Sequence, residues 1–215
     1  MPASFIFAAV TPIKQIKRNA RKVRYVLYKE TLLDFREHLI TFIGAFAGIA
    51  LIAFMQIGKI DGPDNLFLIG SFGASAVLIY GIVHSPLAQP RNLIGGHLFS
   101  ALIGVTIQKM LPGQVWLAPS LAVAISIVVM QITKTLHPPG GATALIATIG
   151  SEKIKALGYW YVINPVLSGV NILFVVALIC NNSVETRSYP SGSFKLFTRL
   201  RGKRNKKPRR IRAGS

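Results

Sequence analysis

Six long stretches of the chain contain no Asp, Glu, Lys or Arg, and this feature limits the fold more than any other. They are residues 39–58, 65–90, 92–108, 110–133, 135–151 and 156–184. A helix that crosses the ~30 Å hydrocarbon core of a bilayer needs about 20 mainly apolar residues, and these stretches are of that order. The sequence therefore predicts an all-α fold, a polytopic membrane helix bundle.

Charge is concentrated at the two ends of the chain. Residues 1–37 carry eight Lys or Arg against three acidic residues, and residues 195–212 carry ten against none, out of a formal net charge of +18. Because basic segments stay on the cytoplasmic side, we expect both termini there and an even number of crossings. The expected location is a bacterial inner membrane.

The same charge pattern divides the chain into three expected parts. Residues 1–38 form a basic segment, amphipathic from residue 14, that lies on the cytoplasmic membrane surface. Residues 39–184 form the transmembrane domain, and residues 185–215 form a basic tail expected to be disordered. We expect both basic ends to bind anionic lipid headgroups; nucleic acid is a less favoured partner for the tail.

A break in the chain precedes one short apolar run. His137-Pro-Pro-Gly-Gly leads into a run that ends at Gly150. Residues 140–150 make roughly 16 Å of helix, about half of the hydrocarbon core, which predicts a half-helix that begins at membrane depth. Its first N–H groups, left free by the prolines, suit an anion. The alternative is that Pro-Pro only starts the helix and Gly-Gly only allows close packing.

A short internal repeat connects this run to an earlier one. Gly73-Ala-Ser-Ala-Val-Leu resembles Gly141-Ala-Thr-Ala-Leu-Ile, 68 residues later. If the match is not chance, the chain contains two units of three elements, each with a broken short helix, as in transporters with discontinuous helices. The units give six crossings, or four if the short helices are re-entrant. The loop charges of Arg91 and Lys134 favour six.

The polar groups within the apolar stretches are mainly donors or cations, and no carboxylate interrupts a stretch. This pattern favours a small anion over proton or sodium coupling through intramembrane carboxylates. The histidines lack the close spacing and the Cys or carboxylate companions of a metal site, so we expect none. We also expect no cofactor and no enzyme activity, because no nucleotide loop, nucleophile elbow or carboxylate pair occurs.

Four motifs occur in order along the apolar region. They are Gly70-Ser-Phe-Gly-Ala-Ser-Ala-Val, His84-Ser-Pro-Leu-Ala-Gln-Pro-Arg-Asn, Thr135-Leu-His-Pro-Pro-Gly-Gly-Ala-Thr-Ala and Asn164-Pro-Val-Leu. Together they resemble the HPP family of integral membrane proteins. Members of the cyanobacterial and plant-plastid type are associated with nitrite transport, so the resemblance implies transport of nitrite or a similar anion.

We therefore expect a transporter or channel whose anion site lies between the two broken helices. A non-transporting membrane anchor or sensor, with termini that bind lipid or a partner, is the alternative, and a homo-oligomer is compatible with both. Arg91 and Lys134 are expected to attract the anion and His84 to line its path. The full set of candidate binding residues is Ser71, Gly73, Ser75, His84, Arg91, Asn92, His97, Lys134, His137, Pro138, Pro139, Gly140, Gly141 and Thr143.

Overall fold

The computed structural model describes residues 35–56 and 63–191, with side chains for residues 35–56 and 70–191. The contacts divide the chain into two units, residues 1–38 and 39–215. Of the first unit, only the opening turn of a helix is described. Most of the predicted amphipathic segment and of the basic tail lies outside the described residues. The account below concerns the second unit.

Every regular element among the described residues is helical, which confirms the all-α prediction. In chain order they are α2 (Phe35–Gln56), α3 (Pro63–Ala76) with its π-helical continuation η1 (Val77–Gly81), the 3-10 turn η2 (Pro86–Ala88), α4 (Pro90–Met110), α5 (Leu117–Ile132), α6 (Pro138–Ile149), α7 (Glu152–Ala156), and the π-helical η3 (Val162–Leu167) leading into α8 (Ser168–Asn181). The short sixth helix starts at the predicted proline break.

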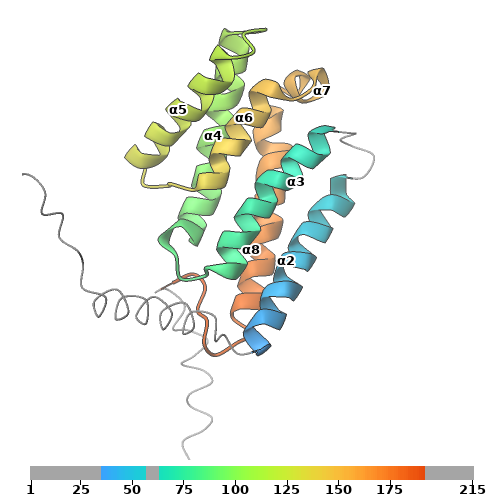
Figure 1. Cartoon of the computed structure of the whole chain (residues 1–215), viewed down its shortest axis with the longest axis vertical. Helices are drawn as coiled ribbons and strands as arrows, with labels where there is room; N and C mark the ends of the chain where they lie inside the picture. The colour runs from blue at the N-terminus through green and yellow to red at the C-terminus, as the bar shows by residue number, and fades with distance from the viewer. Residues whose placement is uncertain (1–34, 57–62, 192–215) are drawn as a thin grey trace, which may run out of the picture. The chain divides into compact units, whose positions relative to one another are not determined.

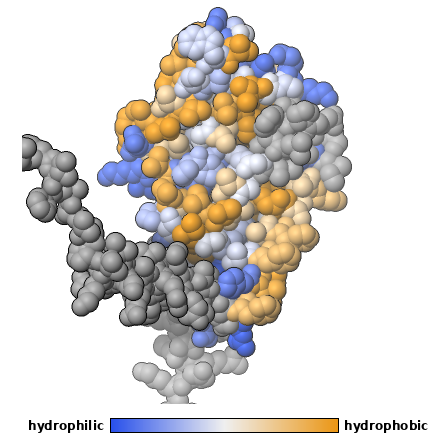
Figure 2. Space-filling model, viewed as in Figure 1, coloured by the Kyte–Doolittle hydropathy of each residue, from blue (hydrophilic) through white to orange (hydrophobic). Residues whose placement is uncertain are grey.

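Three segments in the described part are long and apolar enough to cross a membrane: Phe35–Gln56, Pro90–Met110 and Val162–Asn181. Two shorter apolar helices, Gly70–Gly81 and Leu117–Ile132, accompany them. On α2, the side chains of Phe42, Phe46 and Phe54 are 66–74% exposed, and Figure 2 shows an apolar surface over this helix. Such a surface suits lipid rather than water. The choice between four and six crossings stays a prediction.

The helices alternate in direction along the bundle. In Figure 1, α2, α4 and α6 run one way and α3, α5 and α8 run the other. Thr41, near the start of α2, accepts a hydrogen bond from Arg187, which follows α8, at 2.8 Å. The described helical region therefore begins and ends at the same end of the bundle, in agreement with an even number of crossings.

Arg187 and Tyr189 pack in the bundle, although the sequence-based prediction assigned them to the tail. Arg187 donates to the carbonyl of Tyr80 at 3.1 Å, and the buried Tyr189 hydroxyl donates to the carbonyl of Ala88 at 2.8 Å. The π-helical turn η1 leaves backbone carbonyls that need donors, and Arg187 supplies one. The membrane domain thus extends beyond the predicted boundary at residue 184.

Glycines bring α4 and α6 into close contact. A Cβ at Gly104 would lie 2.7 Å from the carbonyl oxygen of Ala144, and a Cβ at Gly140 would lie 2.9 Å from the carbonyl oxygen of Gly96. A Cβ at Gly96 would collide with the Cβ of His137. Small residues allow helix backbones to approach in this way inside membranes. The contact fixes the start of α6 beside the second turn of α4.

Candidate functional site

The start of α6 offers fewer backbone donors than expected. His137 is the extended N-cap residue, and Pro138 and Pro139, which lack an N–H, occupy the first two helical positions. The N–H of Gly140 donates to the carbonyl of His137 at 2.8 Å. The prediction that this N–H is free is therefore wrong, because the chain turns tightly enough after the prolines to use it internally.

The His137 side chain points into the bundle and is fully buried. Its Nδ1 lies 2.9 Å from the carbonyl oxygen of Leu87, in the η2 turn, and its Nε2 lies 3.0 Å from Oγ of Ser75, on α3. The imidazole therefore joins three separate segments. In lipid, where no bulk water reaches buried polar atoms, such pairing is a condition for burying the ring.

A second imidazole lies beside the first. His97, on α4, has its Nε2 2.8 Å from the same Ser75 oxygen and its Nδ1 2.7 Å from Oγ1 of Thr143, on α6. The two imidazole centroids are 5.0 Å apart, and the ring of Phe72 lies 5.8 Å from His97 on another side. Ser75 thus connects both imidazoles through one hydroxyl.

Ser71 and Thr143 complete the cluster. Their hydroxyl oxygens are 2.9 Å apart, and the Ser71 oxygen is also 3.1 Å from the carbonyl oxygen of Pro139. Ser71 and Ser75 share one face of α3 because they are four residues apart. We call Ser71, Ser75, His97, His137 and Thr143 the buried polar network; each is at most 2% exposed.

The two glycines after the prolines have different surroundings. Gly140 is buried, and a Cβ there would lie 2.8 Å from Oγ of Ser100, so close packing explains this glycine. Gly141 is half-buried, and a Cβ there would meet only Val123, at 3.9 Å. Gly73 on α3 is also half-buried, with nothing within 4 Å of a Cβ. Packing does not account for Gly73 or Gly141.

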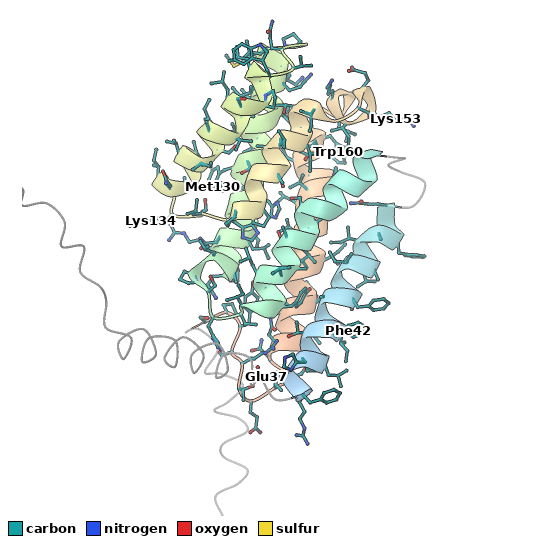
Figure 3. All side chains as sticks on the ribbon, in the orientation of Figure 1. Glu37, Phe42, Met130, Lys134, Lys153 and Trp160 are labelled. Atoms are coloured by element: carbon teal, nitrogen blue, oxygen red, sulfur yellow. The ribbon has the colours of Figure 1, made fainter. Side chains whose placement is uncertain are left out.

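The remaining predicted residues lie outside the buried polar network. Arg91 is exposed and donates to the carbonyl of Thr133 at 2.6 Å, and Asn92 donates to the carbonyl of Leu136 at 2.7 Å. These two side chains hold the α5–α6 connection against the start of α4. His84 is exposed in the connection before η2. Lys134 is exposed, with a positive φ of 56°, and Figure 3 shows it on the outside of the bundle.

Comparison with known proteins identifies the family. The chain matches the family described as HPP, transmembrane region, over residues 30–190. It belongs to the HPP family. One transmembrane protein of Dictyostelium discoideum is 45% identical over 153 residues, which is 70% of this chain and 53% of that protein. A second from the same organism is 44% identical over 153 residues, which is 70% of this chain and 49% of that protein.

This HPP-family chain therefore spans about half the length of the curated relatives it matches. Both relatives are named only as transmembrane proteins, which supports an integral membrane protein and leaves the transported species open. No solved structure matches the chain.

Two participants in the HPP-family site were not predicted from the sequence. The carbonyl of Leu87 accepts from His137, and the buried Tyr161 hydroxyl donates to the carbonyl of Thr143 at 3.0 Å. Tyr161 is buried, whereas its neighbours Tyr159 and Trp160 are exposed. A backbone acceptor carries no residue signature, and a Tyr between aromatic neighbours gives no sign of which ring turns inward.

The chemical groups of the buried polar network limit what it could bind. Among the side chains that the structure describes, no three His, Cys, Asp or Glu residues come together as metal ligands. What the site offers is hydroxyl and imidazole groups, which exchange donor and acceptor roles readily.

Proposed function

We propose that this HPP-family protein transports a small monovalent anion, with nitrite as the expected substrate. The observation that carries the proposal is the buried polar network, which brings two imidazoles and three hydroxyls together at the start of α6. No Asp or Glu occurs from residue 65 to residue 151. A site with donors and no carboxylate suits an anion.

The first turn of α6 offers an edge where the anion would approach. Gly141 lies in this turn, and a Cβ there would meet only Val123, at 3.9 Å, so the backbone has open space beside it. An anion that enters from this edge can replace the Pro139 carbonyl as the acceptor for Ser71. Neutral donors interact strongly with an anion in a low-dielectric setting without the full charge that would trap it. The choice of nitrite comes from the family resemblance.

Lys134, exposed on the connection before α6, is proposed to attract the anion toward this edge. For Arg91, the backbone contact with Thr133 supports a structural role beside an electrostatic one. A bacterial inner membrane, cytoplasmic termini and a homo-oligomer complete the proposal.

Uptake into liposomes tests the function. The purified full chain is reconstituted, and nitrite uptake is compared with that of protein-free liposomes, because nitrous acid crosses lipid without help. We expect saturable uptake, with nitrate and chloride as competitors that define selectivity. Uptake equal to the protein-free background for all three anions would refute transport.

The second candidate is a non-transporting membrane anchor or sensor. The complete pairing of the network favours it, since every imidazole nitrogen and hydroxyl has a partner. A satisfied buried network can simply specify one packing arrangement. This candidate predicts vesicle binding through the basic ends with no anion flux.

A further inference from the structure

The buried polar network is a continuous chain of hydrogen bonds whose direction is fixed by one backbone group. Leu87 contributes a carbonyl, which can only accept, so His137 must donate from Nδ1. A neutral imidazole carries one N–H, and therefore Nε2 of His137 accepts. Its partner is the hydroxyl of Ser75, at 3.0 Å, and that hydroxyl must donate.

The same reasoning sets the other half of the chain. The Ser75 hydroxyl also has the carbonyl of Ser71 within reach, at 3.2 Å, but donation there would leave Nε2 of His137 without a donor. With the Ser75 proton given to His137, the 2.8 Å contact with His97 requires His97 to donate from Nε2. Nδ1 of His97 then accepts, and Thr143 donates to it at 2.7 Å. Ser71 donates to Thr143 or to the Pro139 carbonyl. When Ser71 donates to Thr143, all hydrogen bonds from Ser71 to Leu87 point the same way.

Adding one proton reverses this direction without leaving a donor unpaired. A proton accepted by the Ser71 oxygen lets each group pass its own proton onward: Ser71 to Thr143, Thr143 to Nδ1 of His97, Nε2 of His97 to Ser75, and Ser75 to Nε2 of His137. One proton enters, and one positive charge ends on His137. The hydroxyl of Ser71 then donates to the Pro139 carbonyl, which lies within reach at 3.1 Å.

We propose that Ser71, Thr143, His97, Ser75 and His137 form a proton relay that couples a proton to each anion. The inference rests on the proposed function for its substrate, and it adds the proton as a co-substrate. Histidine chains serve as proton relays within membranes, where an ionisable group is otherwise costly. While the proton is held, the imidazolium charge of His137 offsets the charge of the bound anion. The Leu87 carbonyl cannot pass a proton on, so the proton leaves by the reverse steps through Ser71 when the anion is released.

The two imidazoles are the titratable groups within the relay itself, and the other titratable side chains lie outside it. Besides the two imidazoles, the titratable or charged side chains that the structure describes on the segments around the relay include Tyr80, Arg91, Lys109, Lys134, Tyr161, Cys180 and Tyr189. Arg91 donates to Thr133, Lys109 lies over the ring of Tyr159, and the Tyr161 hydroxyl contacts the Thr143 carbonyl. The relay runs from the buried hydroxyl of Ser71 to His137, whose Nδ1 donates to the carbonyl of Leu87 in the η2 turn.

Nitrogen NMR tests the hydrogen-bond direction without any transport assay. The chain has four histidines, and His38 and His84 are exposed, so a His38→Gln/His84→Gln protein labelled with nitrogen-15 histidine reports only the two buried imidazoles. We expect one imidazole protonated on Nδ1 and the other on Nε2. Two imidazoles of the same tautomer would overturn the relay.

Flux measurements test the coupling, with Thr143→Val and Thr143→Ser as a matched pair. Valine keeps the shape of threonine and removes the hydroxyl, whereas serine keeps the hydroxyl. In liposomes that enclose a pH dye, an outside-acid gradient should increase nitrite uptake about tenfold or more for the unmodified chain and for Thr143→Ser. After the uptake by protein-free liposomes under the same gradient is subtracted, the gradient should have no effect on Thr143→Val.

The outcomes separate the two proposals. Nitrite uptake that ignores the pH gradient and leaves the lumen pH unchanged would overturn the relay while anion transport stands. Absence of nitrite uptake, with a potential-driven proton flux that Thr143→Val abolishes, would refute the anion proposal and keep the relay. Absence of both fluxes would refute both.

Discussion

At the residue scale, two adjacent glycines are expected to have different roles: Gly140 allows close helix packing, and Gly141 leaves room for the anion. A side chain at Gly140 would collide with Ser100 and with the backbone of Gly96. Gly140→Ala should therefore lower the free energy of unfolding by about 1–3 kcal/mol, the usual cost of overpacking. Gly141→Ala should cost little, because only Val123 lies near the new methyl group. Thermal unfolding of both purified variants in one detergent measures the difference, and equal losses would contradict the packing account.

Arg91 and Lys134 should also differ in what their substitution changes, the folded amount for Arg91 and the nitrite flux for Lys134. Arg91→Gln removes a donor that holds the Thr133 carbonyl, so the amount of folded protein should fall, by a small factor because the contact is exposed. Lys134→Gln should leave that amount unchanged and reduce nitrite flux per molecule. Fluorescence size-exclusion profiles measure the folded amount, and liposome uptake measures the flux. A Lys134→Gln protein with full flux would exclude the attracting role.

The sequence predicted which residues are polar within the apolar region, and all five members of the buried polar network were among them. It did not predict their pairing. Ser75 meets both His97 and His137 only because Gly96 and Gly140 let α4 and α6 approach closely, and that contact is made across the fold. For the same reason Arg91 was interpreted as a permeation residue, since its backbone partner, Thr133, is 42 residues away in sequence.

At the element scale, the proline break defined α6 almost to the residue. A pair of prolines fixes the first two helical positions, and Gly150 follows the last one. The same rules could not reveal the π-helical turns η1 and η3, because their form depends on tertiary partners such as Arg187 at the carbonyl of Tyr80. The number of crossings also stays open, because length alone does not decide whether a short helix spans.

The start of α6 should be reachable from water at Gly141, on the side that faces Val123 of α5. The only cysteine is Cys180, so Cys180→Ala gives a background without thiols. On it, Gly141→Cys should react with a membrane-impermeant thiol reagent, and nitrite should slow that reaction. A cysteine at Ala144, which is fully buried, serves as the control and should stay unreactive. A Gly141→Cys protein that reacts no faster than this control would contradict an open anion path.

At the scale of the whole molecule, the pairing of Thr41 with Arg187 places the start of α2 and the end of α8 at one end of the bundle. Tags at residues 1 and 215 should therefore be cleaved by protease from the same side of the membrane, which the charge of the ends predicts to be cytoplasmic. Opposite accessibility of the two tags in sealed vesicles would contradict both the fold and the topology.

The central claim is that an anion passes the start of α6 at Gly141, and Gly141→Val tests it most directly. The two added methyl groups project into the space that the glycine leaves open, where only Val123 lies near the Cβ position. Gly81→Val is the control, because Gly81 is exposed and also has nothing within 4 Å of a Cβ. Nitrite uptake is measured for both variants at equal reconstituted amounts.

Gly141→Val should reduce the rate of nitrite uptake about tenfold or more, which corresponds to an activation free energy raised by at least about 1.4 kcal/mol. Gly81→Val should transport like the unmodified chain, and both proteins should elute as folded species from a size-exclusion column. A well-folded Gly141→Val protein with unchanged nitrite uptake would show that the anion does not pass the start of α6.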